Sequence, residues 1–226
     1  MAQRLSGERL VRRSSGEDAA RHIQRLIFNG ELRPGARVPQ DEIAQNLGIS
    51  RIPVREALIA LEREGWVTIE MHRGAFVNAI DEVGVRDHYE LLGLVYGFAA
   101  SRALARRGPG LVSDLAAIAG QMEGTNDAVA LGQLSFRFMA TLVDGAGSPR
   151  IKAVLRAMSA LVPGDFFVEV PAATAVEKRG IAAVVRALRR GDATRVSDEL
   201  LGMMRRVGDK VVEVFASRGL FDATPG

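Results

Sequence analysis

The sequence predicts a mainly α-helical protein in which three short helices and a β-hairpin precede a larger all-helical domain of six to seven helices. Two observations support this prediction. Apolar residues recur at helical spacing along most of the 226 residues, and the period changes to strict alternation only between residues 66 and 80. Glycine or proline separates successive periodic segments. We therefore expect an N-terminal arm over residues 1–14, a first domain over 15–78 and a second domain over 79–226.

The first two helices are marked by signals at their ends. The stretch GEDAARHIQRLIF places its apolar residues on one helical face, and Asn29 and Gly30 follow it as a helix stop. A connector with Pro34 and Gly35 then forms a turn. QDEIAQNL predicts a short second helix, which Gly48 can close in the left-handed conformation. Two helices therefore precede the segment GISRIPVREALIALEREGW.

That segment predicts a third helix with two different parts. Its later turns carry a buried stripe at spacing i, i+4 and i+7, formed by Val54, Leu58 and Leu61. Arg51 and Arg55 are one turn apart at its start and project away from this stripe. They are placed either to contact a ligand or to pair with Glu56 or with acidic residues of the preceding helix.

A change of period predicts a two-stranded hairpin after the third helix. The alternating apolar residues are Val67, Ile69, Ala75 and Val77, and the tip is His72-Arg73-Gly74. Three helices followed by a hairpin form a winged helix-turn-helix, in which the N-terminal residues of the recognition helix lie in the DNA major groove. Arg51 and Arg55 then face base edges, where an arginine fork on guanine gives about 1–3 kcal/mol of discrimination. Ile52 can contact a thymine methyl group, and Ser50 suits a phosphate.

The stretch IQRLIFNGELRPGARVPQDEIAQNLGISRIPVREALIALEREGWVTIEMHRGAFV closely resembles the DNA-binding domain of the GntR family of bacterial transcription regulators. The shared motifs are the PG connector, the LGISRIPVREAL segment and the RGAFV wing. Carried over by position, the resemblance implies DNA contacts from the recognition helix and from the wing tip. These residues are Ser50, Arg51, Ile52, Pro53, Arg55, His72, Arg73 and Gly74. We exclude Asp41, where some members carry arginine, because a carboxylate repels phosphate.

From residue 81 onward, every long segment predicts a helix. The segment PGDFFVEVPA differs, and we expect a loop or a short extended piece there. By its size, helix number and fragments such as LSFRFMATLVDGAGSPRI, this part resembles the FCD effector domain of the FadR branch of the family. Many members of that branch hold a divalent metal with one Asp and three His. The matching positions here are Gln133, Arg137, Ile181 and Met203, none of which is a usual metal ligand. We therefore expect no such metal site and no cofactor.

If these four residues line the corresponding cavity, it is apolar with one cation, Arg137. Such a cavity fits a small anionic or acyl-type ligand, such as a carboxylate or phosphate. Two alternatives stay open, because Arg137 can instead pair with Glu177 or lie exposed. We expect His88 and Tyr96 at the edge of the core and the pair Met203-Met204 within it.

Composition excludes several classes of protein. The chain is 47% hydrophobic and 25% charged, its net charge is +3, and it contains no cysteine. No apolar run approaches the roughly 20 residues that cross a bilayer, and no secretory signal is visible, so we expect a cytoplasmic protein without membrane contact. Every basic residue up to Asn78 is arginine, which suits phosphate contacts but is also typical of a GC-rich genome. No nucleophile, base or phosphate-binding loop indicates an enzyme.

We therefore expect a DNA-binding transcription regulator, acting as a repressor, whose affinity for double-stranded operator DNA responds to a small-molecule effector. One short recognition helix covers few base pairs, so the protein should bind a near-palindromic site as a homodimer. The alternative is a ligand-independent DNA-binding or protein-interaction module with a helical dimerisation domain.

Overall fold

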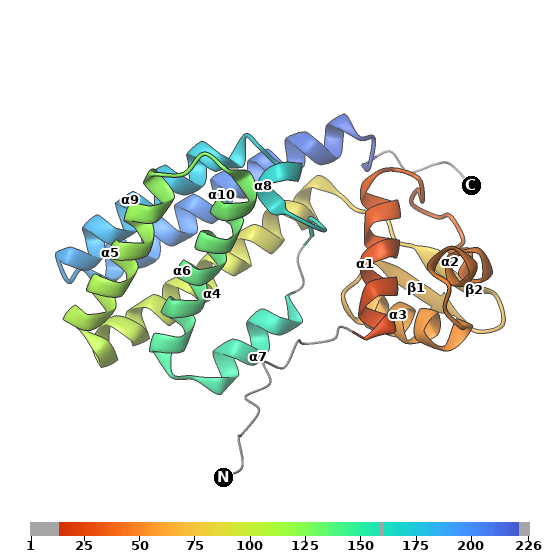
Figure 1. Cartoon of the computed structure of the whole chain (residues 1–226), viewed down its shortest axis with the longest axis horizontal. Coiled ribbons are helices and arrows are strands. Elements are labelled where there is room, and N and C mark those ends of the chain that lie inside the picture. The colour runs from red at the N-terminus through yellow and green to blue at the C-terminus, as the bar shows by residue number, and fades with distance from the viewer. Residues whose placement is uncertain (1–13, 159–160, 222–226) are drawn as a thin grey trace, which may run out of the picture.

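A computed structural model describes residues 14–158 and 161–221, and it confirms the mainly helical fold with a small two-stranded sheet (Figure 1). A compact N-terminal domain lies beside a longer bundle of helices. The elements of the N-terminal domain are α1 (Ser15–Phe28), α2 (Gln40–Leu47), α3 (Arg51–Arg63), β1 (Val67–Glu70) and β2 (Gly74–Val77). Those of the bundle are α4 (Glu82–Arg107), α5 (Pro109–Glu123), α6 (Ala128–Ala146), α7 (Pro149–Ala157), α8 (Phe166–Glu169), α9 (Ala173–Arg189) and α10 (Ala193–Ser217).

Local signals determine where the first two helices begin and end. The hydroxyl of Ser14 accepts a hydrogen bond from the backbone N–H of Glu17, whose carboxylate accepts one from the N–H of Ser14. This capping box satisfies two N–H groups that α1 would otherwise leave unpaired. Ser14, the last residue of the expected arm, caps the start of α1, and residues 1–13 lie outside the described residues. Gly48 closes α2 with φ of 64°, as its position predicted.

The core of the N-terminal domain lies between α1, α3 and the hairpin. Val54, Leu58 and Leu61 are buried, which confirms the predicted stripe, and they pack with apolar residues of α1 such as Ile23 and Ile27. This packing fixes how α3 is rotated about its axis, because turning it would expose the stripe.

The wing is an antiparallel hairpin with Val67 opposite Val77 and Glu70 opposite Gly74. The connector between α1 and α2 runs along its outer strand. The N–H of Gly35 donates to the carbonyl of Val77, and the N–H of Val38 donates to that of Ala75. These bonds tie the wing to the beginning of α2.

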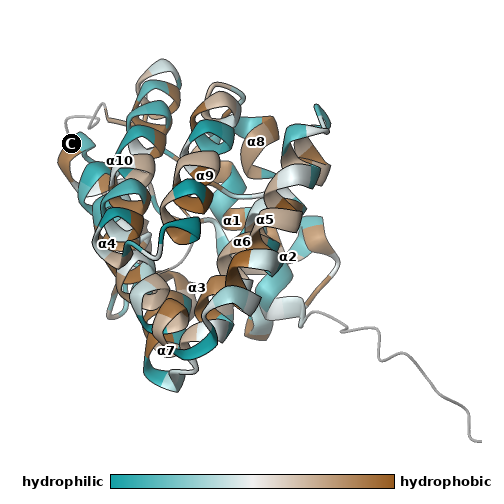
Figure 2. Cartoon of the chain, turned by 90° about the vertical axis from the view of Figure 1, so that its left-hand side faces the viewer, coloured by the Kyte–Doolittle hydropathy of each residue, from teal (hydrophilic) through white to brown (hydrophobic). Residues whose placement is uncertain are grey.

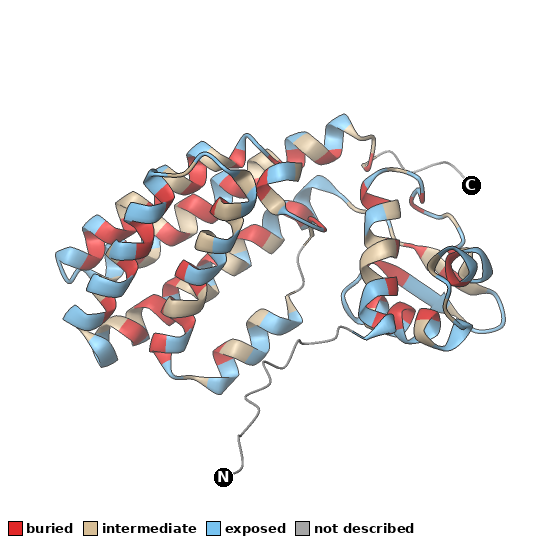
Figure 3. Cartoon of the chain, viewed as in Figure 1, coloured by how far each residue is buried: buried red, intermediate tan, exposed pale blue. Residues whose placement is uncertain are grey.

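In the bundle, the long helices α4 and α10 pack along one another, and α6 and α9 cover them. Figure 2 looks onto the end of the bundle farthest from the N-terminal domain, where hydrophobic and hydrophilic residues alternate around the helices. Figure 3 shows buried residues gathered on their facing sides. Met203 and Met204 lie in this core as expected. Phe166–Glu169 form the helical turn α8, so our expectation of a loop or extended piece was wrong for these residues.

Glycines allow the close packing of α4 against α10. A β-carbon built on Gly93 would lie 2.9 Å from the Cα of Leu201, and one built on Gly97 would lie 3.1 Å from the Cβ of Ser197. A β-carbon on Gly208 of α10 would lie 2.9 Å from that of Tyr89. Side chains at these positions would force the two helices apart.

A small apolar junction joins the two domains. Phe28, the last residue of α1, is buried against Phe215 of α10 in an edge-to-face contact with 5.5 Å between the ring centroids. Arg218 lies over the ring of Phe28 at 4.0 Å and donates a 2.8 Å hydrogen bond to Glu169 of α8. The end of α1 thus belongs to the core of the bundle.

No described helix is both long enough and apolar enough to cross a membrane.

The glycine contacts predict a directional effect on stability. Gly93→Ala should lower the free energy of unfolding by about 1–3 kcal/mol, because the new methyl group meets the backbone of α10. The matched control is Gly120→Ala in α5, where a β-carbon has open space. That change should raise stability by roughly 0.5–1 kcal/mol through helix propensity. Urea unfolding followed by circular dichroism measures both, and equal effects would contradict the close-packing interpretation.

Candidate nucleic-acid interface and effector-domain site

The first turn of α3 presents a row of exposed side chains. Arg51 and Arg55 are exposed, and Ile52 is 69% exposed although it is a large apolar residue. Ser50 precedes the helix in an extended conformation, and its hydroxyl makes no capping hydrogen bond. The N–H groups at this helix end and the Ser50 hydroxyl can therefore bind an anion such as a phosphate. Pro53 is half-buried beneath this row.

Arg51 forms an ion pair with Asp41 of α2. This is one of the two possibilities left open by the sequence, in which an acidic residue of the preceding helix pairs with Arg51. Both side chains are exposed, so the pair contributes at most about 1 kcal/mol and can exchange for a phosphate or a guanine. Arg55 makes no ion pair with any residue in the described part of the chain. The two arginines thus differ in what holds them before a ligand binds.

The wing tip carries a second set of exposed groups. Met71, His72 and Arg73 form the turn between β1 and β2, and His72 has a φ of 61°, which is unusual for a residue other than glycine. Arg73 pairs with Glu70 and lies over the ring of Phe76 at 5.4 Å. Gly74 has a φ of 112°, so the sharp end of the hairpin depends on glycine at this position.

Our sequence analysis missed Arg37. Its guanidinium packs against Gly74, where an added β-carbon would lie 2.8 Å from the Arg37 Nε atom. Arg37 also lines, together with Arg51, a groove of about 410 Å³ beside the start of α2. The connector, the wing and α3 therefore contribute cations to adjoining surfaces. Only the position of Arg37 just after the PG turn pointed to it in the sequence.

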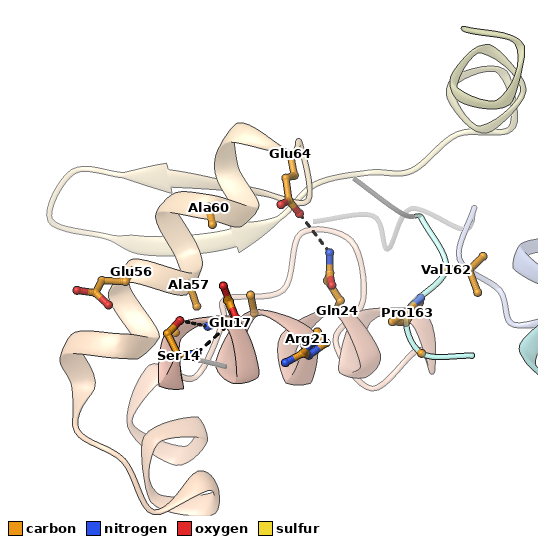
Figure 4. Close-up of a pocket in the computed structure, with 13 residues that line it drawn as sticks. Ser14, Glu17, Arg21, Gln24, Glu56, Ala57, Ala60, Glu64, Val162 and Pro163 are labelled. Atoms are coloured by element: carbon orange, nitrogen blue, oxygen red, sulfur yellow. Dashed lines mark hydrogen bonds between the residues drawn. The ribbon is translucent and has the colours of Figure 1, made fainter. Parts of the chain in front are cut away.

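A different face of α3 is acidic. A groove of about 470 Å³ lies between α1, α3 and residues 162–164 (Figure 4). Glu17 and Glu56 line it, and Gln24 donates a 3.2 Å hydrogen bond to Glu64 there. Carboxylates repel phosphate, so this face cannot carry the same contacts as the first turn of α3.

In the bundle, the four residues expected to line one cavity are separated. Gln133 and Arg137 of α6 are exposed, whereas Ile181 and Met203 are buried in the core. Arg137 donates a 2.9 Å hydrogen bond to Gln121 of α5. The physical reason is the rotation of α6, which turns Leu131, Phe138 and Leu142 inward and the opposite face outward. Of the alternatives left open for Arg137, the structure therefore has the exposed side chain, and it does not pair with Glu177.

The polar group that α6 does turn inward is Ser135, whose hydroxyl donates a 2.6 Å hydrogen bond to Glu177 of α9. Glu177 is only 3% exposed. Burial raises the pKa of the Glu177 carboxyl, and the bond from Ser135 offsets this in part. Burial and the nearby Glu177 charge also raise the pKa values of Tyr89 and Tyr96. A carboxyl in the apolar core thus favours its protonated form.

Within residues 14–158 and 161–221, no three side chains of His, Cys, Asp or Glu come together in a way that could hold a metal ion. His88 packs edge-on against Tyr89, and burial lowers its pKa, so its imidazole favours the neutral form.

A separate groove lies between α4, α6 and α7. It measures about 270 Å³, and Tyr96, Phe136 and Leu155 contribute apolar surface to it. Phe136 is 76% exposed. Lys152 and Arg156 lie one turn apart on α7 at this groove, and Lys152 pairs with Asp144 at 2.6 Å. Arg156 has no ion-pair partner among the residues described, so the groove combines an apolar floor with a free cation.

Family models match both parts of the chain. Residues 15–77 match the model described as bacterial regulatory proteins, gntR family, and residues 87–206 match the FCD domain. The chain is 37% identical over 146 residues to an HTH-type transcriptional regulator of Mycobacterium tuberculosis, an alignment that covers 65% of this chain and 60% of that relative. It is 32% identical over 94 residues to the HTH-type transcriptional repressor RspR of Escherichia coli, covering 42% of this chain and 39% of RspR.

Solved structures share the fold. A Listeria monocytogenes protein, Lar, superposes with a TM-score of 0.61 at 18% identity, covering 89% of this chain and 98% of Lar. Escherichia coli McbR/YncC superposes with a TM-score of 0.58 at 16% identity, covering 91% and 99%. At these identities the superpositions show a common arrangement of helices.

The buried carboxyl predicts a pH-dependent stability difference. Because its folded pKa is raised, Glu177 keeps its proton in the folded state while the unfolded chain loses it above the ordinary value of 4.5. The native protein should therefore lose stability as the pH rises from about 4.5 towards the folded pKa. Glu177→Gln should remove that loss.

The measurement is urea unfolding of both proteins at a series of pH values from about 4.5 upward. The stability of Glu177→Gln relative to the native protein should increase with pH, and Glu123→Gln on the exposed end of α5 is the matched control. A difference for Glu177→Gln that stays constant with pH would contradict the assignment.

Proposed function

The chain belongs to the GntR family of bacterial regulatory proteins and carries an FCD domain, and from this premise we propose that it is a transcription regulator. It binds operator DNA as a homodimer through its N-terminal domain and responds to a small ligand in its C-terminal domain. The single observation that supports the DNA-binding part best is the first turn of α3. That turn exposes Arg51, Ile52 and Arg55 while the later turns hold α3 on the core.

In the proposed complex, α3 enters the major groove with its N-terminal end toward the bases. Arg55, which has no ion pair within the described ranges, donates to a guanine, and Arg51 exchanges Asp41 for a base or a phosphate. Ile52 contacts a thymine methyl group. Ser50 and the N–H groups of this turn, with Pro53 setting the backbone, bind the adjacent phosphate.

The wing follows the neighbouring backbone or minor groove. Arg73 leaves Glu70 for a phosphate, with His72 and Gly74 shaping the tip. Arg37 joins this set, because it touches Gly74 and shares a groove with Arg51. Binding that depends on several phosphates must weaken steeply as salt rises.

For the ligand, we propose a small amphipathic anion, such as an acyl or aromatic carboxylate, in the groove between α4, α6 and α7. Phe136 and Tyr96 offer apolar surface, and Arg156 offers a cation for a carboxylate. A ligand that binds more tightly to one arrangement of the two domains shifts the population toward it and so changes operator affinity. In this proposal the ligand-free protein occupies the operator and blocks transcription, so that it acts as a repressor.

Arg55→Ala and Arg51→Ala should each weaken binding to the operator by about 5- to 150-fold, which corresponds to about 1–3 kcal/mol per base contact. Both side chains lie outside the core, so the melting temperature should not change. Fluorescence anisotropy with an operator fragment selected from genomic DNA measures the affinity. The matched control is Arg63→Ala, an exposed arginine in the last turn of α3.

Unchanged operator affinity in both Arg51 and Arg55 variants would refute the proposed orientation of α3. A titration with salt tests the alternative of a protein-interaction module. Affinity for duplex DNA that does not fall as salt rises would favour that alternative.

Arg156→Ala should reduce the affinity for octanoate by at least tenfold, because it removes the unpaired cation at the groove. Isothermal titration calorimetry measures this change, and Arg195→Ala, an exposed arginine on α10, is the control. Octanoate that binds equally well to Arg156→Ala, or that binds to neither protein, would rule out this groove as the carboxylate site.

A further inference from the structure

We propose that two copies of the chain pair through the outer face of α4, in antiparallel orientation, with Asp87 of each copy against Arg102 of the other. The proposal rests on the homodimer of the proposed function and names its interface. It concerns a face of α4 that takes no part in DNA contact or in the ligand groove.

The outer face of α4 carries a continuous apolar stripe. Leu91, Leu94 and Phe98 are 52%, 51% and 54% exposed. At about 100° per residue, the spacing i, i+3 and i+7 puts all three within a narrow sector of the helix. Val83, one further large apolar residue, is 66% exposed near the start of the same helix. An exposed apolar stripe of this length is typical of an interaction site.

The opposite face of α4 is already used within the chain. Gly93 and Gly97 touch α10, and Ala99 and Ala103 are buried in the bundle core. A helix that is apolar on both sides is usually covered on both sides. Among the described residues of one copy, α10 and α6 cover the inner side of α4, whereas the side with Leu91, Leu94 and Phe98 stays exposed.

Two residues of opposite charge flank the stretch from Leu91 to Phe98, and their positions favour a second copy of the chain as the partner. Asp87 lies one turn before Leu91, and Arg102 lies one turn after Phe98, on the same face. Neither residue makes an ion pair with the rest of the chain as described, although Arg102 lies over its own Phe98 ring at 5.2 Å. Neighbouring charges on α4 pair within the chain, such as Glu90 with Arg205.

The positions of these residues fit one two-fold arrangement. If two copies of α4 pair antiparallel with Leu91 opposite Phe98, then Asp87 lies opposite Arg102, because each charge is four positions outside the apolar residue beside it. The two-fold axis forms this ion pair twice, once at each end. A parallel pairing would instead place Asp87 against Asp87 and Arg102 against Arg102.

This interface also bears on DNA recognition. α4 begins at Glu82, shortly after the end of β2 at Val77. A fixed pairing of the two α4 helices therefore sets the distance between the two wings and between the two α3 helices. The spacing of operator half-sites should follow from it.

The experiment is sedimentation velocity of the full chain without DNA. Asp87→Arg alone and Arg102→Asp alone should each raise the dimer dissociation constant by at least tenfold, because each places like charges together twice. An equimolar mixture of the two variants should return to within threefold of the native value. In that heterodimer, one copy carries a cation at both positions and the other carries a carboxylate at both, so both ion pairs form again.

The apolar stripe is tested with Leu94→Glu, which should abolish the dimer, and with Val129→Glu as the control at an exposed valine on α6. Circular dichroism melting checks that each variant folds. A native monomer, a dimer that survives Leu94→Glu, or a mixture of charge variants that stays monomeric would each overturn the proposal. A native dimer that responds as expected but does not bind duplex DNA would overturn the proposed function instead.

Discussion

Where α4 packs along α10, glycines replace larger residues, and the two helices lie too close together to leave room for a β-carbon at these positions. Gly93 and Gly97 on α4 and Gly208 on α10 all lie at this contact. Because both helices are long, fixing their contact fixes the bundle that packs around them. It also determines which face of α4 points outward and where the N-terminal domain, joined to the start of α4, is held.

The sequence was most informative where local signals decide the structure. Gly48, the stripe at Val54 and Leu58, and the hairpin beside Gly74 each depend on a few neighbouring residues, and each could be predicted from them. The rotation of α6 could not, because apolar residues occur on more than one of its faces. Phe136 is exposed while Phe138 is buried, and only the packing of the whole bundle decides between them. The inward turn of Ser135 toward Glu177 follows from that same packing.

Before any ligand binds, the exposed arginines of the N-terminal domain are partly neutralised by its own acids. Asp41 pairs with Arg51, and Glu70 pairs with Arg73. A phosphate must displace these carboxylates before it binds the arginines. This displacement lowers the affinity for DNA of every sequence by the same amount. Base contacts then account for a larger share of the difference between correct and incorrect sequences. Weak ion pairs within the binding surface thus favour discrimination between DNA sequences over high affinity for DNA in general.

The junction at Phe28 has a mechanical consequence. The ring belongs to the core of the bundle, yet it ends the helix against which α3 packs, and Arg218 holds it from the far side. A small rotation of α10 about its own axis would therefore tilt α1 as a rigid lever. Because α3 packs on α1 and lies away from the contact between Phe28 and α10, the same tilt would move α3 farther than it moves Phe28. A movement too small to disturb the packing of the bundle can in this way change the position of α3 relative to the DNA groove that we propose it enters.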